Sequence, residues 1–452
     1  MVSLRREGNL ALISVNNPPV NALSPGVPDG IIAAIRQATA DESVHAVILI
    51  GSGRTFIAGA DIREFQLMTS GRKEAKVGLY TLMLALEDSP KPVVCAIHGS
   101  ALGGGLEVAL ACHYRVAVSS AQLGQPEVRL GLIPGAGGTQ RLPRLAGVAK
   151  ALEMVVYGDP IGASDALQNG ILDHIVPGDL LQGALAWTRE LLAKGVALRK
   201  TRELSSKRGN DAVNAPLFDT ARLEAKRRAP GWLAPLKAIE AVEAATRLPF
   251  EEGCRREEGL FMECLFSDQS RALIHVFFAE RDVARIPEGA KAAYEAASRR
   301  LSARCRYEVQ SLIADGASAD EVERTLHEFG MRGDWVPAAS CAAVSEDLRS
   351  SIPVGREEIL ERLLYASVNE GARILEEGLP ARAAHIDILC IRDCGFPSYR
   401  GGPMWHADIK GLQTVYRRIC SFRERHGDRW EPAPLLGRLA ECGQSFAEYD
   451  AR

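Results

Sequence analysis

The chain has 452 residues, enough for about three domains, although one or two large domains would also fit. Its composition, 46% hydrophobic and 25% charged, is typical of globular proteins and excludes a disordered or collagen-like chain. The 54 basic and 57 acidic residues leave a net charge of −3, so we expect no general basic surface for nucleic acid.

No segment approaches the roughly 18 uninterrupted apolar residues of a membrane span, so we expect none. The first residues, 1–7, lead directly into a strand-like pattern, which predicts no signal peptide. The last four, 449–452, do not form a peroxisomal signal. These features predict a cytoplasmic enzyme.

The ten cysteines are scattered along the chain, and only Cys390 and Cys394 lie close together. They lack the second cysteine or histidine pair that a zinc site needs, so no metal site is predicted. Several cysteines stand inside apolar runs, as Cys95 does. We therefore expect buried, reduced thiols.

Short strand and helix patterns alternate over the first ~175 residues, with buried strands expected at 10–15, 46–50 and 93–97. The last two of these runs lead into glycine-rich turns, and residues 29–40 have apolar positions at helical spacing. Repeated strand, glycine turn and helix predict an α/β region at residues 1–182.

The sequence pattern changes after residue 182, where long helical patterns rich in Arg, Lys and Glu replace the strand patterns. We expect a helical linker region at 183–287, followed by a helical domain at 288–452. The basic stretch 198–208 is interpreted as a solvated helix face or loop, with a phosphate contact as the alternative. Residues 335–351 are weakly patterned and predict a loop.

A faint internal repeat marks the helical domain. The hexamer Ser311–Gly316 recurs as Arg373–Gly378, and two further similarities follow in the same order downstream. Three matches in order favour a duplicated helical unit.

Three clusters of small residues in the α/β region carry the chemistry. They are Phe56–Ile62, His98–Glu107 and Gly124–Gln140. Small side chains let backbone amides approach a ligand, and a helix that opens after glycines presents free N–H groups. Two such amides and the carboxylates Glu107 and Glu127 can form an oxyanion hole with acid–base groups. Each feature also has a structural interpretation, such as a tight turn, a dipole partner or a solvated loop residue.

Together the clusters resemble the enoyl-CoA hydratase/isomerase (crotonase) superfamily in order and spacing, from Asn17 to Asp173. The resemblance implies a crotonase-like α/β spiral of ββα units. It also implies that the amides of Ala60 and Gly104 polarise the thioester carbonyl of an acyl-CoA, while Glu107 and Glu127 handle the water and the proton added at Cα. The implied CoA and substrate contacts are Ala58, Gly59, Asp61, Ile62, Gly103, Pro134 and Gly135.

Family hydratases keep both glutamates, so the resemblance favours hydration of 2-trans-enoyl-CoA in fatty acid β-oxidation. Isomerisation of a Δ3 to a Δ2 double bond through Glu127 is the alternative within the family. CoA would then be part of the substrate, and no separate cofactor is expected.

A second resemblance covers the last region. Glu357–Gly371 and Gly395–His406 look like the C-terminal helical domain of 3-hydroxyacyl-CoA dehydrogenases, and the region before them resembles the linker of multifunctional β-oxidation proteins. Those proteins carry a NAD-binding Rossmann domain between linker and helical domain. This chain has no G-x-G-x-x-G sequence, and the distance from Arg285 to Leu301 is too short for such a domain. We therefore expect no NAD site and no dehydrogenase activity.

The layout resembles peroxisomal and bacterial fusion proteins, and we expect a bacterial source. The helical appendage leaves a further alternative, an assembly subunit of a fatty acid oxidation complex. Removing a domain on which such helices pack exposes apolar surface. We therefore expect that the chain associates with itself or with a thiolase partner.

Overall fold

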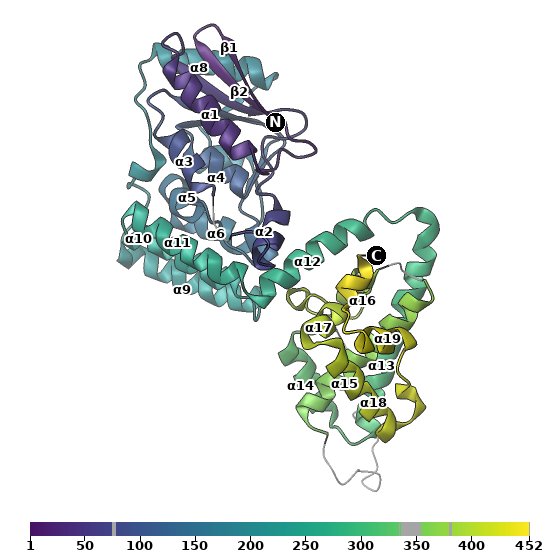
Figure 1. The fold of residues 1–452 in the computed structure, drawn as a ribbon. Coiled ribbons are helices and arrows are strands. Elements are labelled where there is room, and N and C mark those ends of the chain that lie inside the picture. The colour runs from purple at the N-terminus through teal and green to yellow at the C-terminus, as the bar shows by residue number, and fades with distance from the viewer. Residues whose placement is uncertain (75–77, 334, 336–353, 379–381, 452) are drawn as a thin grey trace. The chain divides into compact units, whose positions relative to one another are not determined.

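The computed structural model describes residues 1–74, 78–333, 335, 354–378 and 382–451 (Figure 1). These residues form two compact units, Met1–Ser270 and Arg271–Arg452. Residues 183–270 therefore fold with the α/β region. The boundaries expected at 182/183 and 287/288 stay predictions.

The first unit is built on a six-stranded sheet with the order β1-β2-β3-β4-β6-β9, in which only the β1–β2 pair is antiparallel. Its strands are β1 (Val2–Glu7), β2 (Leu10–Val15), β3 (Ala46–Gly51), β4 (Val93–Ile97), β6 (Tyr114–Val118) and β9 (His174–Val176). A second sheet contains β5 (Ser100–Leu102), β7 (Gln122–Gly124) and β8 (Ile161–Gly162). The three predicted strands are confirmed.

Both faces of the large sheet are buried, which explains its continuous apolar runs. Along β2, Ala11, Ile13 and Val15 join the main core of the unit, whereas Leu10 and Leu12 join a second core. The second core is closed by helix α8, Leu180–Ala193. Alternate side chains of one strand thus pack in opposite layers.

Helices cover the rest of the first unit (Figure 1). They are α1 (Val27–Ala40), α2 (Ile62–Thr69), α3 (Tyr80–Glu87), α4 (Gly104–Ala111), α5 (Gly138–Ala146), α6 (Val148–Tyr157), α7 (Ala163–Gln168), α9 (Asp211–Arg228), α10 (Ala234–Arg247) and α11 (Phe250–Leu265). Two 3₁₀-helices, η1 (Glu127–Leu130) and η2 (Thr201–Glu203), complete the unit. Helices α10 and α11 pack on α5, so the linker region covers the segment that precedes α5.

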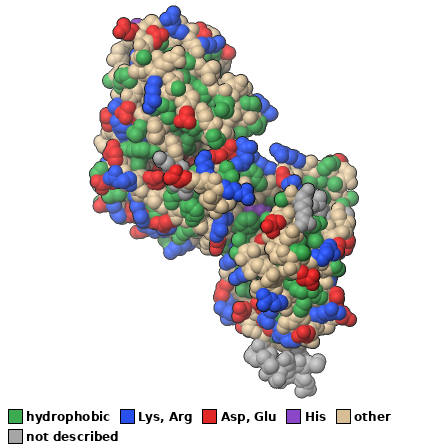
Figure 2. Space-filling view, viewed as in Figure 1, with side chains coloured by type: hydrophobic (Ala, Val, Ile, Leu, Met, Phe, Trp, Pro, Cys, Tyr) green, Lys and Arg blue, Asp and Glu red, His purple; other side chains and the backbone are tan. Residues whose placement is uncertain are grey.

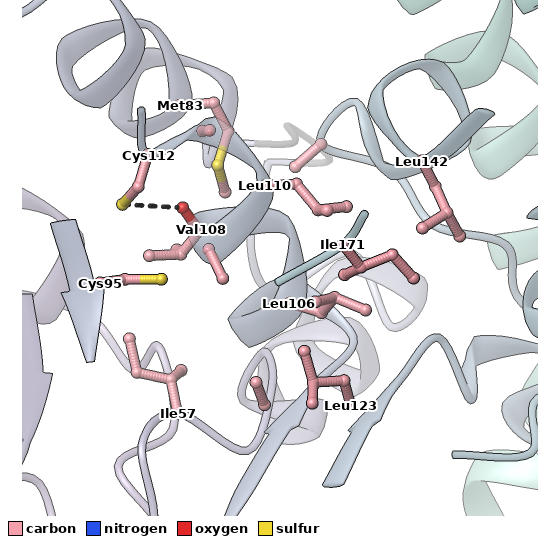
Figure 3. Close-up of a cluster of buried hydrophobic side chains, with 14 of the residues drawn as sticks. Ile57, Met83, Cys95, Leu106, Val108, Leu110, Cys112, Leu123, Leu142 and Ile171 are labelled. Atoms are coloured by element: carbon pink, nitrogen blue, oxygen red, sulfur yellow. Dashed lines mark hydrogen bonds between the residues drawn. The ribbon is translucent and has the colours of Figure 1, made fainter. Parts of the chain in front are cut away.

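Helix α4 is buried along its whole length (Figure 3). Leu106, Val108 and Leu110 of α4 lie within the main core, near Cys95 of β4. The Cys112 thiol donates to the carbonyl of Val108 over 3.3 Å. Because this helix has no solvent-facing side, its N-terminus is held rigidly in place.

Nine cysteines lie within the described residues and are free, and seven of them are buried. The predicted buried thiols are confirmed for those seven. Cys442 is exposed in the turn that follows α19, and Cys420 is half-buried on α18.

The basic stretch at 198–208 is a loop with one short 3₁₀-helix, and several of its cations pair with acids. Lys200 and Arg202 contact Asp88, and Arg199 contacts Asp173. On the face that Figure 2 shows, basic and acidic side chains are intermixed.

The second unit is helical throughout its described residues. It contains α12 (Asp268–Val283, which begins in the last residues of the first unit), α13 (Lys291–Ala314), α14 (Ala319–Phe329), α15 (Arg356–Glu376), α16 (Ala383–Asp393), α17 (Pro403–Lys410), α18 (Leu412–His426), α19 (Pro434–Glu441) and α20 (Phe446–Asp450). Three 3₁₀-helices join them: η3 (Glu288–Ala290), η6 (Ser398–Arg400) and η7 (Asp428–Trp430). Among the residues that the structure describes, no strand follows β9.

The predicted duplication is visible in these helices. The long helices α13 and α15 each end shortly before a glycine of positive φ, Gly316 and Gly378. Each is followed by an 11-residue helix, α14 or α16. The loop expected at 335–351 lies, apart from Trp335, outside the described residues.

No helix in the described part of the chain is both long and apolar enough to cross a membrane.

A buried ion pair stands at the centre of the second unit. The Arg362 guanidinium and the Glu308 carboxylate are both fully buried, and their closest atoms are 2.6 Å apart. Arg362 also contacts Asp315 at 2.8 Å. Two helices, α13 and α15, are joined by this pair.

Replacing Arg362 with Met should destabilise the second unit by about 3 kcal/mol, since it removes the closest cation from the buried Glu308 carboxylate and leaves it with Arg304 at 3.4 Å. Hydrogen exchange of the α13 and α15 amides reports this loss for the second unit alone. As a control, Arg438→Met removes an exposed pair with Glu376 and should cost less than about 1 kcal/mol. Equal losses for the two variants would contradict the prediction.

Candidate active site

Three loops that are distant in sequence meet at the start of α4. Isolated bridges join Leu23 to Ala60 and Ile57 to Ala101, which brings the Phe56–Ile62 segment against the loop before α4. A Cβ placed on Gly104 would lie 3.4 Å from the backbone nitrogen of Ala60. The first two predicted clusters are therefore adjacent.

The third cluster lies on the other side of the same turn. A Cβ placed on Gly103 would lie 3.0 Å from Oε1 of Glu127, and Gly103 has a φ of 52°. A side chain here would be strained and would crowd the carboxylate. Glycine at position 103 thus lets Glu127 approach the two amides.

Two backbone amides at this junction are available for a ligand. Helix α4 begins at Gly104, so the Gly104 N–H has no acceptor within its own helix. At the neighbouring loop, the Leu23 amide donates to the Gly59 carbonyl, and the Ala60 N–H is left beside it. Within the described residues, neither the Ala60 nor the Gly104 amide donates a hydrogen bond to the backbone. Two adjacent free donors at a helix N-terminus suit a developing negative charge.

Glu107 is buried on the first turn of α4 and is held by a second turn. Its Oε1 accepts the amides of Ala136 and Gly138, both at 2.8 Å. Burial raises the pKa of Glu107, while these two amides and the Arg141 guanidinium oppose the rise. None of the described residues donates to its Oε2, so this oxygen is left for a ligand or water.

Glu127 opens η1 and is half-buried. When the Gln125 side-chain amide is oriented to donate, its nitrogen lies 2.9 Å from Oε1 and 3.1 Å from Oε2 of Glu127. Removal from water, and then the carboxylates of Glu107 and Glu257, raise the pKa of Glu127 well above its ordinary value. The site therefore pairs two carboxyl groups of different environment, which is typical of acid–base chemistry.

A third carboxylate, Glu257 of α11, was not predicted. It is buried, and it accepts the amides of Gly137 at 2.5 Å and Thr139 at 2.9 Å. The sequence does carry a signal for it. Glu257 stands at helical spacing within an apolar stripe that includes Cys254 and Phe261, where a charged residue needs a buried partner.

The described residues contain no group of three or more His, Cys, Asp or Glu side chains that could hold a metal ion.

Two family models match the chain. Residues 5–216 match the enoyl-CoA hydratase/isomerase model, and residues 359–447 match the model of the 3-hydroxyacyl-CoA dehydrogenase C-terminal domain. The first part of the chain belongs to the enoyl-CoA hydratase/isomerase family. A crotonase-like α/β region followed by a helical dehydrogenase-type domain is the predicted fold class, and it is confirmed.

The curated relatives include the "Peroxisomal bifunctional enzyme" of Danio rerio, which is 41% identical over 287 residues, 63% of this chain and 39% of that protein. The "Glyoxysomal fatty acid beta-oxidation multifunctional protein MFP-a" of Cucumis sativus is 38% identical over 283 residues, 62% of this chain and 39% of that protein. The chain thus spans about two fifths of these relatives. Among solved structures, carnitinyl-CoA hydratase from Mycobacterium avium is 30% identical, with a TM-score of 0.44, and covers 62% of this chain and 95% of its own.

The other residues implied by the family resemblance surround the two amides. Ala58, Gly59, Asp61 and Ile62 form the loop into α2, and Pro134 and Gly135 lie in the turn before α5. The Asp61 carboxylate caps α2 and is occupied by Arg63 and by the Ser24 hydroxyl, which lies at 2.9 Å. Its side chain stabilises the loop, and contacts from this loop to CoA stay a prediction.

The raised pKa of Glu127 predicts a pH-dependent stability. Ionising Glu127 is harder in the folded protein than in the unfolded chain, so the fold loses stability as pH rises from 4.5 through the raised pKa. Gln cannot ionise, so the melting temperature of Glu127→Gln minus that of the wild type should increase over this range.

Glu42→Gln, the same change at an exposed residue, is the matched control, and the pH trend for Glu127→Gln is measured relative to it. A difference for Glu127→Gln that is constant from pH 4 to pH 8 would refute the predicted shift.

Proposed function

We propose that the chain is an enoyl-CoA hydratase that adds water to 2-trans-enoyl-CoA in fatty acid β-oxidation. The observation that carries the proposal is the placement of two carboxyl groups, Glu107 and Glu127, around two adjacent free amides, Ala60 and Gly104. Family membership supports the substrate class, an acyl-CoA thioester.

The two amides account for activation of the substrate. The thioester oxygen accepts the Ala60 and Gly104 N–H groups at the N-terminus of α4, where the helix dipole favours negative charge. Electron density moves from the C2–C3 double bond toward this oxygen, which makes C3 electrophilic. Each such donor typically contributes a factor of roughly 10²–10³ in rate.

The two carboxyl groups account for the addition of water. Glu107, held through Oε1, uses Oε2 to take a proton from water as the water oxygen bonds to C3. Glu127, whose raised pKa favours the protonated form, gives its proton to C2 as the enolate collapses. The product is a 3-hydroxyacyl-CoA with the water oxygen at C3 and the Glu127 proton at C2. Glu107 then loses to solvent the proton that it took from water, and Glu127 regains a proton from solvent, so the net addition over one cycle is one water molecule.

Isomerisation of a Δ3-enoyl-CoA is the alternative within the family. It needs one group that moves a proton between C4 and C2, and Glu127 alone could do this. The bonding of Glu107 to two backbone amides favours hydration, since isomerisation needs no second carboxylate to hold water.

A second alternative gives the chain an assembly role in a fatty acid oxidation complex, with catalysis secondary, through self-association or a thiolase partner. The dehydrogenase-type C-terminal domain is the feature that supports it. The cytoplasmic location stays a prediction, whereas the two curated relatives named above are a peroxisomal and a glyoxysomal protein by name.

Glu107→Gln and Glu127→Gln should each lower turnover of crotonyl-CoA by at least about 100-fold, the contribution of a positioned acid–base group. Loss of the enoyl-thioester absorbance measures the rate, and circular dichroism checks folding. Glu42→Gln should keep wild-type turnover. A folded Glu107 or Glu127 variant with near wild-type turnover would assign that residue a structural role only.

We also propose that the chain does not oxidise 3-hydroxyacyl-CoA. Residues 217–358 are matched by neither family model, and strands for a second parallel sheet do not occur in the described part of that range. A dinucleotide site of the Rossmann type needs a strand, a glycine turn and a helix N-terminus.

Incubation with 3-hydroxybutyryl-CoA and NAD should therefore produce no reduced nicotinamide. The change in its absorbance is the measurement, with heat-inactivated protein as the control. Turnover above that control would overturn this part of the proposal.

A further inference from the structure

The turn before α5 is held by carboxylates on two sides. Four successive amides, from Ala136 to Thr139, donate alternately to two different glutamates. Ala136 and Gly138 donate to Glu107, and Gly137 and Thr139 donate to Glu257 of α11. The amides that bind Glu107 alternate along the chain with those that bind Glu257. Because consecutive peptide units are rigid, the orientation of one set is coupled to that of the other.

The Glu257 carboxylate has further hydrogen bonds to this turn. Its carboxylate also accepts the Thr139 hydroxyl. That hydroxyl oxygen accepts a hydrogen bond from Nε2 of the Gln140 side chain at 2.8 Å, so its own hydrogen is directed to Glu257. Each oxygen of Glu257 therefore has a donor on the turn.

The carbonyl side of the turn is held as well. Arg141 donates to the Ala136 carbonyl over 3.2 Å. The same guanidinium pairs with Glu87 at 2.7 Å, and both side chains are buried. Helix α11 supplies a further contact, since a Cβ on Gly135 would lie 2.7 Å from the Phe261 ring.

We propose that Glu257 is a positioning residue of the hydration site, which orients Glu107 through the turn at 136–139. The proposal rests on the hydratase function proposed above. Glu257 lies outside the segment 5–216 that matches the hydratase family model, so the linker region completes the site. Neither family match assigns a role to this residue.

The hydrogen bonds of Glu257 can be changed at nearly constant volume. Burial and the nearby Glu107 carboxylate raise its pKa to about 8, while the Thr139 hydroxyl and the Gly137 and Thr139 amides oppose this rise. Glu257→Gln replaces one acceptor oxygen with an NH₂ group. The Gln nitrogen cannot accept, so at least one of the Gly137 and Thr139 amides loses its acceptor.

Two variants test the proposal by kinetics. Glu257→Gln keeps one acceptor oxygen, and Glu257→Leu keeps none at similar volume. We expect kcat for crotonyl-CoA to fall in the order wild type, Gln, Leu, by about 10- to 100-fold overall, as for a catalytic group displaced by about 1 Å. KM should stay within about threefold, because Glu257 contacts the turn and not the thioester site.

Glu258 is the matched control. It is the next residue of α11, it is exposed, and its replacement with Gln or Leu should leave kcat unchanged. Rates are compared per folded molecule, from circular dichroism at the assay temperature. If Glu257→Leu does not fold, Glu257→Gln still tests the order. Unchanged kcat, or a change confined to KM, would overturn the proposal.

A crystal structure of Glu257→Gln tests the positioning independently of activity. We expect Glu107 to lose at least one of its 2.8 Å contacts with Ala136 and Gly138. Retention of both contacts would overturn the positioning role. If the wild type does not hydrate crotonyl-CoA, the proposed function fails, and this crystallographic result still decides the role of Glu257.

Discussion

The site depends on one constraint, the cost of burying carboxylates without hydrogen bonds. Glu107 and Glu257 are both buried, and each needs donors that water cannot supply there. Four consecutive amides at the start of α5 meet this need, two for each carboxylate. The turn is rigid because all four of its amides donate hydrogen bonds. The Glu107 carboxylate, which accepts two of them, is therefore held in one orientation.

The sheet places the remaining parts. Strands β3 and β4 are parallel neighbours, so their carboxyl ends lie at the same edge, and the loops that follow them carry Ala60 and Gly104. Burial of α4 on every side then fixes the second amide. Hydrophobic packing thus sets the distance between the Ala60 and Gly104 amides, the two proposed hydrogen-bond donors.

The local sequence pattern was sufficient to predict the strands and turns, because these depend on residues that are close together in the sequence. The strands at 10–15 and 93–97 follow from apolar runs, and the turn at Gly103–Gly105 follows from its glycines. Glu257 was missed because its partner, Gly137, stands 120 positions away, and no local pattern encodes that pairing. The exposed thiol of Cys442 was also missed, since exposure of the turn after α19 depends on which elements pack beside it.

The central claim is that two carboxyl groups and two amides add water to an enoyl thioester. The most direct test is incubation of the wild type with crotonyl-CoA in ¹⁸O-labelled water, followed by mass spectrometry of the product. Hydration predicts 3-hydroxybutyryl-CoA with one labelled oxygen at C3, formed only with active protein. Recovery of unlabelled crotonyl-CoA alone would contradict the account.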